Sequence, residues 1–565
     1  MIGMKQTLIR VLVPVCLLAG AGACHDLVNL DEQPLTFIDP ANFFKTAPQA
    51  IEAVNGMYAP LMTWDDWISP AWRDVACEEP DVYCPGWAPT FGYRGANPGA
   101  WFAGRTWTSN FLVVRLANDV LGQLDRVTFD TTLTGRLRGE AHFLRGYAYF
   151  ELVRRYGAVP LRLKPYQPDG TYGDAPRAPL EAVYASIVSD LKAAALELPA
   201  DFASKTYTSA DRGRPTAPSA WGLLSKVYLT MAGADVAGTP LAALKAAYND
   251  SARMAAQQVM QSGWVALEPT YMRLFDWQQQ TNSNEILFQI GATHRENTGS
   301  EVGTFYNPPD YSTVGGGGGG VMSMRKVFYE TFEPNDRRVA PGQAIFAAWR
   351  RSGSSSDPGT PTWLNRSVPD SVTAKLATAT QVGWAWLGDD HCDTVGWSRY
   401  HLADSSFLEL SPQLYTMKYI DRTALTKSQN ANHAIVLRHA DVLLVFAEAE
   451  NEVHGPTAAA YDAINQVRNR AGLPNLTASL SQTQFRDAVW MERRHELYAE
   501  FQGWFDLKRQ GRWLGIMNDQ LPAYPGSPTP SASICQQGRQ AYQLLLPIPA
   551  SELGANRLIT QNPGY

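Results

Sequence analysis

Residues 435–453 read IVLRHADVLLVFAEAENEV, and this stretch decides the fold class. Apolar side chains recur in it every three or four positions, as on the buried side of an amphipathic helix: Val436, Ala440, Leu443 or Leu444, and Ala447. Gly455 and Pro456 follow and predict a turn. Thr457 is a suitable N-cap for a second helix that ends near Gly472.

These two helices form a pair close in length to the 34-residue tetratricopeptide unit. The Trp-Leu-Gly-Tyr signature of that repeat is absent, so the comparison rests on length and topology. The same periodicity predicts helices over 47–61, 108–127, 135–156, 179–198, 216–233, 240–262 and 482–510, and the tail suggests a strand over 544–549. The sequence therefore predicts a mainly α protein, a superhelix of tetratricopeptide-like helix pairs.

Two regions interrupt the helical pattern. Residues 62–107 are rich in Gly and Pro and contain Trp64, Trp67, Trp72, Trp87, Trp101 and Trp107. Residues 264–434 have short helical runs and dense turn residues, including an unbroken glycine run at 315–320. Long loops within compact domains are usually functional. We interpret the first region as an aromatic loop and the second as a large loop-rich, partly β insertion that forms a ligand face.

Composition excludes two classes of protein. Of the 565 residues 45% are hydrophobic and 18% charged, which is enough apolar material for a large core and excludes a mainly disordered chain. The net charge is −6 and no long basic run is present, which argues against a broad phosphate-binding footprint for nucleic acid.

The N-terminus has the pattern of an export signal. Lys5 and Arg10 precede an apolar run, and small residues follow up to Ala23. Cys24 comes next, as in a bacterial lipobox, although Ala21 stands where Leu is usual. We expect a signal peptide over 1–23 and a lipid on Cys24; a plain signal peptide cut nearby is the alternative.

No later segment reaches about 18 uninterrupted apolar residues, so no transmembrane helix is expected in the mature chain. We divide that chain into an N-terminal helical region over 24–263, the insertion over 264–434 and a C-terminal helical region with the tail over 435–565, all within one compact body. Cys77, Cys84, Cys392 and Cys535 allow three disulfide pairings. Cys77 with Cys84 is the simplest pairing, and free buried thiols are the alternative.

Four blocks of the sequence resemble the SusD/RagB family. They are GEAHFLRGY at 139–147 with RYGAVP at 155–160, LRHADVLL at 437–444 with AEA at 447–449, ERRHEL at 492–497 with GWFDLKR at 503–509, and PIPASE at 547–552 with Asn556 and QNPGY at 561–565. The blocks occur in the family's order. Together with the signal and Cys24 they extend over nearly the whole chain.

The resemblance implies an outer-membrane lipoprotein of a Bacteroidetes-like bacterium. Members of the family capture nutrients, most often glycans, at the cell surface and act as lids on SusC-type TonB-dependent transporters. Their fold has a helical base of tetratricopeptide-like pairs and a loop-rich face. We therefore expect a non-enzymatic protein that captures an oligosaccharide or polysaccharide and passes it to such a transporter.

Charged residues in the matching blocks fit a structural network. A charge is tolerated inside a protein when it is paired and hydrogen-bonded. We expect such a network between packed helices from Arg438, Asp441, Glu448, Arg493, Glu496 and Glu500. The alternative is that Glu496 and Glu500, four residues apart, form the acid and base of a glycosidase.

Ligand contacts are expected from aromatic residues in the loops, because an indole face stacks on the apolar face of a sugar ring. The candidates are Trp72, Asp81, Trp87, Tyr93 and Trp101 in the first region, and Tyr306, Tyr311, Trp384 and Trp397 in the insertion. Core packing is the alternative role for any one of them.

The remaining signals are weak. His391, Cys392 and Asp393 suggest a metal, but no second ligand pair at zinc spacing follows, so we expect no metal and no cofactor. Three other functions stay open: the same transporter-lid role with a peptide ligand, a surface glycan hydrolase, and a helical scaffold whose aromatic residues form a protein interface.

Overall fold

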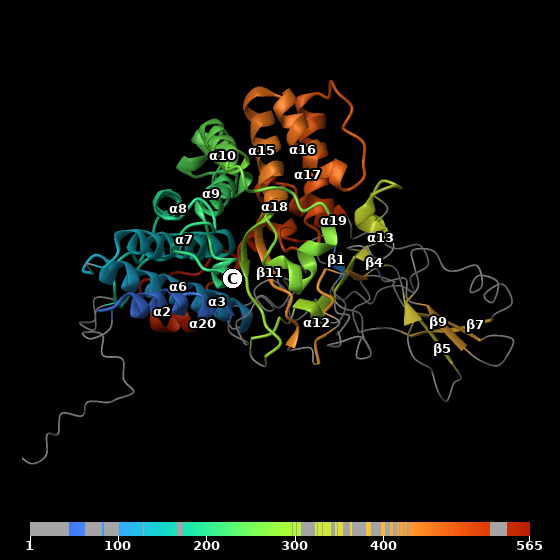
Figure 1. Cartoon of the computed structure of the whole chain (residues 1–565). Helices are drawn as coiled ribbons and strands as arrows, with labels where there is room; N and C mark the ends of the chain where they lie inside the picture. The colour runs from blue at the N-terminus through green and yellow to red at the C-terminus, as the bar shows by residue number, and fades with distance from the viewer. Residues whose placement is uncertain are drawn as a thin grey trace, which may run out of the picture.

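A computed structural model of the chain describes residues 44–62, 82–83, 101–295 without 128 and 167–172, short segments between 298 and 425, then 429–519 and 539–565. Most of the described residues are helical, as the sequence predicts. Figure 1 shows one group of helices on the left, a second group in the upper middle, and a small β-sheet on the right. The tetratricopeptide-like character of the helix pairs remains a prediction.

Helices that follow one another along the chain also pack against one another. In the first group α6 contacts α7, α7 contacts α8, and so on to α10, which contacts α15 of the second group. α15 in turn packs against both α16 and α17. The bounds are α6 Trp101–Leu124, α7 Thr131–Tyr156, α8 Leu180–Glu197, α9 Ala217–Met231, α10 Lys245–Met260, α15 His439–His454, α16 Ala458–Arg470 and α17 Gln482–Glu496.

Most of the predicted helices are present, with shifted ends. The helix expected over 47–61 is two, α2 (Ala47–Gly56) and α3 (Ala59–Met62), and the one over 240–262 begins as a 3-10 turn before α10. α6 begins at Trp101, so the aromatic loop ends there and not at residue 107. Trp107 is a core residue of that helix.

Short polar side chains fix where several helices begin. The carboxylate of Asp130 accepts the amides of Thr132 and Leu133 at the start of α7. Ser481 and Gln484 form a reciprocal capping box at the start of α17. These contacts satisfy amide groups that have no partner within the helix.

The stretch 435–438 is a strand, so the prediction of helix from residue 435 is wrong. β11 (Ala434–Arg438) pairs antiparallel with β2 (Ile286–Ile290), and all five residues of each strand are buried. α15 begins only at His439. Four residues are too few to separate the two patterns, and pairing with a distant strand overrides the local periodicity.

The single helix expected over 482–510 is also wrong. α17 ends at Glu496, and α18 (Gly503–Arg509) begins after a turn in which Ala499 and Phe501 have φ near +60°. The turn is held from outside. Lys418 Nζ donates to the carbonyls of Glu496 and Tyr498, and the Tyr419 hydroxyl donates to the carbonyl of Ala499.

Apart from β1 (Val82–Tyr83), the region 264–434 carries the remaining described strands. β5 (Trp349–Gly353), β6 (Thr362–Trp363), β7 (Thr380–Ala385), β8 (Trp397–His401) and β9 (Phe407–Leu410) form an antiparallel sheet in the order β6-β5-β9-β8-β7. Figure 1 shows part of this sheet lying apart from α6–α8. β4 (Ile345–Phe346) pairs with β10 (Tyr415–Thr416).

The C-terminal tail closes the first helical group. No strand forms over 544–549, because the side chain of Gln561 takes the place of a partner strand and bonds both the amide and the carbonyl of Ile548. Asn562 donates to the carbonyls of Tyr156 and Leu546, and Leu546 N donates to the carbonyl of Arg155. α20 (Ala550–Ala555) lies against α6 (Figure 1).

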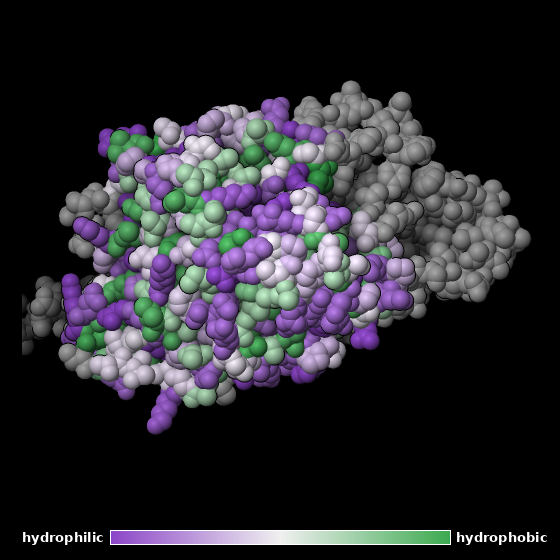
Figure 2. Space-filling view, turned by 90° about the horizontal axis from the view of Figure 1, so that it is seen from above, coloured by the Kyte–Doolittle hydropathy of each residue, from purple (hydrophilic) through white to green (hydrophobic). Residues whose placement is uncertain are grey.

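Within the described part of the chain, no helix is both long and apolar enough to cross a bilayer. On the face seen in Figure 2, hydrophilic and hydrophobic residues are interleaved, as is normal for a surface in contact with water.

Close helix contact at Gly139 gives a test of the packing. A Cβ at this position of α7 would lie 2.8 Å from Leu198 Cγ and 3.0 Å from Leu198 N. We expect Gly139→Ala to lower the free energy of unfolding by about 1–3 kcal/mol, because an overpacked contact forces the backbone to shift. Chemical denaturation measures the change.

The matched control is Gly56→Ala, at an exposed helix position where a Cβ would meet nothing within 4 Å. This substitution should be neutral or stabilise by about 0.5–1 kcal/mol, because alanine favours the helix. An equal loss in both variants would contradict the packing argument.

Candidate functional site

Much of the predicted ligand site lies outside the described residues. This applies to Trp72, Asp81, Trp87, Tyr93 and Tyr311, to the lipid site Cys24, to the four other cysteines of the predicted mature chain, and to the His391–Asp393 group. Trp101, Trp384 and Trp397 lie in described backbone, at the start of α6, in β7 and in β8.

Backbone pairing joins the two regions that were predicted to bind ligand. β1 (Val82–Tyr83) belongs to the aromatic loop and β3 (Ser323–Met324) to the insertion, and they pair antiparallel with Val82 opposite Met324. Asp81 directly precedes β1 in the sequence. The pairing therefore brings segments about 240 residues apart in sequence to one place, which is a requirement for a shared site.

β7 and β8 bring a second pair of candidates onto neighbouring strands. In their register Trp384 lies opposite Ser398, and Trp397 lies opposite Ala385. β7 is at the edge of the five-stranded sheet. The positions of Trp384 and Trp397 are thus fixed by the sheet backbone and not by a free loop.

Tyr306 is a core residue. It ends α12 (Val302–Tyr306) and is 1% exposed. Its ring packs against the rings of Tyr419 and Phe501, each with a centroid distance of 5.7 Å. The burial of Tyr306 favours core packing over ligand contact.

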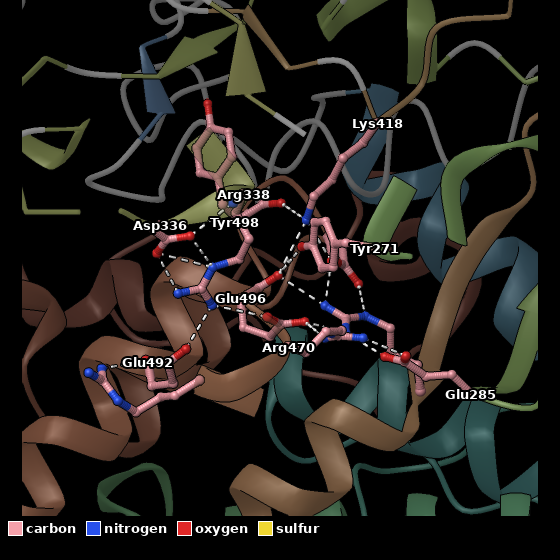
Figure 3. A network of polar contacts seen from close by, with 12 residues as sticks. Tyr271, Glu285, Asp336, Arg338, Lys418, Arg470, Glu492, Glu496 and Tyr498 are labelled. Atoms are coloured by element: carbon pink, nitrogen blue, oxygen red, sulfur yellow. Dashed lines mark hydrogen bonds and ion pairs between the residues drawn. The ribbon is translucent and has the colours of Figure 1, made fainter. Parts of the chain in front are cut away.

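The six charged residues predicted to form a network are buried and lie in two ion-pair clusters. The first surrounds Glu496 at the end of α17. Arg438 donates to Glu496 at 2.6 Å, to Glu285 at 2.8 Å and to Glu500 at 2.8 Å. Arg470 also bonds both Glu285 and Glu496. Figure 3 shows Glu496 between Arg338 and Arg470.

The first cluster ties the insertion to the helices. Arg338 and Lys418 both belong to the insertion and are fully buried. Arg338 donates to Glu492 at 2.7 Å and to Glu496 at 3.0 Å, and Lys418 donates to Glu500 at 2.6 Å. The insertion is therefore fixed to α17 at two points along its length, one on each side of the five-stranded sheet in sequence.

The second cluster joins four helices, α9, α15, α17 and α18. Asp441 on α15 accepts Lys226 of α9 at 2.7 Å and Arg493 of α17 at 2.8 Å. Arg493 and Arg509 share Asp506 of α18, and Arg509 forms a bidentate pair with Glu448 of α15. This bidentate geometry is among the stronger forms of ion pair.

Paired arginines set the pKa of the central carboxyls. Burial alone would raise the pKa of Glu496, but Arg470, Arg438 and Arg338 outweigh it and hold the pKa well below its usual range. Arg438 and Lys418 likewise lower the pKa of Glu500 against the effect of burial. A glycosidase acid needs a raised pKa and contact with substrate. The buried, ionised pair Glu496 and Glu500 has neither.

Sequence reasoning missed half of this network. Glu285, Arg338, Lys418 and Arg470 lie far from the matching blocks in sequence, and their own neighbourhoods carry no charge pattern that marks them as buried. Among the described residues, no group of three or more His, Cys, Asp or Glu side chains is placed to hold a metal ion.

Comparison with known proteins identifies the family. The model of the SusD family matches residues 284–565, and a second model, described as "Starch-binding associating with outer membrane", matches residues 100–229. The chain belongs to the SusD family. Both ion-pair clusters of this SusD-family protein are built mainly from residues inside the first match.

Relatives and solved structures agree with this assignment. SusD-like protein P2 of Formosa agariphila is 25% identical over 579 residues, covering 100% of each chain. A SusD homolog of Bacteroides thetaiotaomicron has the same fold with a TM-score of 0.73 at 23% identity, covering 93% of this chain and 98% of the other. A laminarin-binding SusD-like protein gives a TM-score of 0.66 at 20% identity, covering 92% and 100%.

Removing one charge from the first cluster should destabilise the SusD-family protein strongly. In Glu496→Gln, Arg438, Arg470 and Arg338 lose the carboxylate that they share. We expect a loss of about 3–5 kcal/mol in the free energy of unfolding, because a buried charge is left without its partner. Asp487→Asn is the control, since the Asp487–Arg512 pair is exposed and should contribute about 0–1 kcal/mol.

The network also predicts sensitivity to acid. The folded-state pKa values of Asp441, Glu496 and Glu500 lie below their ordinary values, so their contribution is complete above about pH 4–4.5 and is lost as the pH falls further. Burial raises the pKa of Glu492, which acts in the opposite direction, but it is one carboxyl against three. Denaturation at a series of pH values should show stability falling below about pH 4.5, with a smaller slope in Glu496→Gln.

Proposed function

We propose that this protein captures an oligosaccharide or polysaccharide at the cell surface and delivers it to a SusC-type TonB-dependent transporter. The observation that supports the proposal most is membership of the SusD family, one of whose matching models is described as starch-binding and associated with the outer membrane. In this proposal Cys24 carries a lipid that holds the protein on the outer membrane.

The ligand would lie on aromatic residues of the loop-rich face. Trp72, Trp87, Tyr93 and Trp101 would contribute from the aromatic loop, with Asp81 bonding hydroxyl groups. Trp384 and Trp397, with Tyr311, would contribute from the insertion. The β1–β3 pairing supports this arrangement because it joins the two regions. Stacking on an indole face buries apolar area of both partners without requiring charge.

Binding without hydrolysis is the favoured activity. The one carboxylate pair that the sequence offered as an acid and base is committed to structural arginines. A similar fold is found in a protein whose title states that it binds laminarin. Both observations support a receptor that leaves its glycan intact.

Affinity electrophoresis tests the proposal. The soluble protein without residues 1–24 is run in native gels that contain starch, laminarin or xylan. We expect retardation in at least one polysaccharide, and no sugar products when the same polysaccharide is incubated with the protein. Release of products would establish the hydrolase, and the absence of retardation in every gel would direct attention to peptide ligands.

Two double variants locate the platform. Trp87→Ala with Trp101→Ala removes rings of the aromatic loop, and Trp384→Ala with Trp397→Ala removes rings of the insertion. Loss of retardation in either identifies the region that holds the glycan. Trp264→Ala is the control, because the indole of Trp264, the first residue of the insertion, packs on Phe202 and donates to the carbonyl of Ala200 in the N-terminal helical region.

A further inference from the structure

We propose that Trp277 and His294 form a separate saccharide subsite of this protein, outside the aromatic loop and the β7–β8 pair. The inference rests on the proposed glycan-binding function. The subsite is supported by the packing and hydrogen bonding of these two residues. Neither residue lies in the blocks that resemble the family, and neither is among the aromatic candidates predicted from the sequence.

Trp277 is held at the surface by its own short helix. It opens α11 (Trp277–Gln280), where Asp276 caps the helix by accepting the amide of Gln278. The side chain is half-buried and lies outside the hydrophobic core that the described residues form. Within the described structure its indole N–H has no hydrogen-bond partner. An indole so placed offers both an apolar face and a donor to a ligand.

His294 stands beside this indole. The two rings have a centroid distance of 4.5 Å and are nearly perpendicular, at 84°. The His294 side chain is 34% exposed. Its Nε2 lies 2.8 Å from Asp421 Oδ2 and 3.1 Å from the Thr423 hydroxyl, whereas Nδ1 meets no polar partner among the residues that the structure describes.

A buried carboxylate fixes the orientation of the His294 ring. Asp421 accepts the amides of Ala431 and Thr423 and the Thr423 hydroxyl in addition to His294. Burial alone would raise the pKa of Asp421, but these hydrogen bonds lower it, so the group stays a carboxylate. Nε2 therefore carries the hydrogen that points at Asp421, and Nδ1, which has no partner among the described residues, is the ring nitrogen left for a ligand.

The combination suits a neutral sugar residue. The C–H face of a pyranose can stack on Trp277, while one of its hydroxyls hydrogen-bonds Nδ1 of His294 and another accepts the indole N–H. Hydrogen bonds to Asp421 and Thr423 hold the His294 ring, and the perpendicular contact with that ring positions Trp277, before any ligand arrives. Such preorganisation reduces the entropy cost of binding. A polymer that reaches this subsite as well as the main platform would gain by avidity.

The test compares two half-buried tryptophans. Affinity gels with laminarin or soluble starch give the dissociation constant of the protein without residues 1–24 and of Trp277→Ala, His294→Ala and Trp264→Ala. We expect the Trp277 and His294 variants to bind on the order of fivefold more weakly to the polysaccharide that retards the wild type. Trp264→Ala should be unchanged, and Trp277→Phe should keep most of the affinity because it keeps an aromatic face.

The outcomes separate the subsite from the main proposal. If Trp277→Ala and His294→Ala both bind the polysaccharide as tightly as the wild type, the subsite is overturned and the receptor function stands. A wild type that binds no polysaccharide overturns both. Thermal melting of each variant shows that it is folded, and if Trp277→Ala melts early, His294→Ala and Trp277→Phe decide the question.

Discussion

The ion pair between Arg438 and Glu496 is the contact on which the rest of the structure depends. Arg438 ends β11 and precedes α15, and Glu496 ends α17, so the pair fixes the meeting point of a strand and two helices. Arg470 and Arg338 converge on the same carboxylate. Because Arg338 comes from the insertion, the insertion is attached to the helical base through charge and not through apolar packing alone.

These buried ion pairs explain how the loop-rich insertion is held against the helices. Lys418 bonds the last carbonyl of α17, that of Glu496, and the carbonyl of Tyr498 in the following turn, a task that a glycine turn or water usually performs at a helix end. Asp421, three residues later, orders the loop that carries Thr423 and contacts His294. The same short segment thus connects the buried network to the surface where Trp277 lies.

Local periodicity predicted α7, α8 and α9 to within a few residues, because each is a long amphipathic or buried helix with clear caps. It failed where a distant group decides the local structure. Residues 435–438 form a strand because they pair with β2, and the chain turns after Glu496 where Lys418 bonds its carbonyls. The Gln561 side chain takes the place of a partner strand at Ile548. The charged residues within the blocks were recognisable. Their partners in the insertion were not, and neither was Trp277, whose role depends on His294 and Asp421 being close in space.

The C-terminal tail has a consequence for how the protein is made. Asn562 and Leu546 bond the end of α7, so the first helical group is completed only by residues about 400 positions later in the chain. β2 similarly waits for β11, about 150 residues further on. Such late, long-range closure is slow. For the export that the N-terminal sequence predicts, this delay would be an advantage, because a chain that folds early cannot be secreted unfolded.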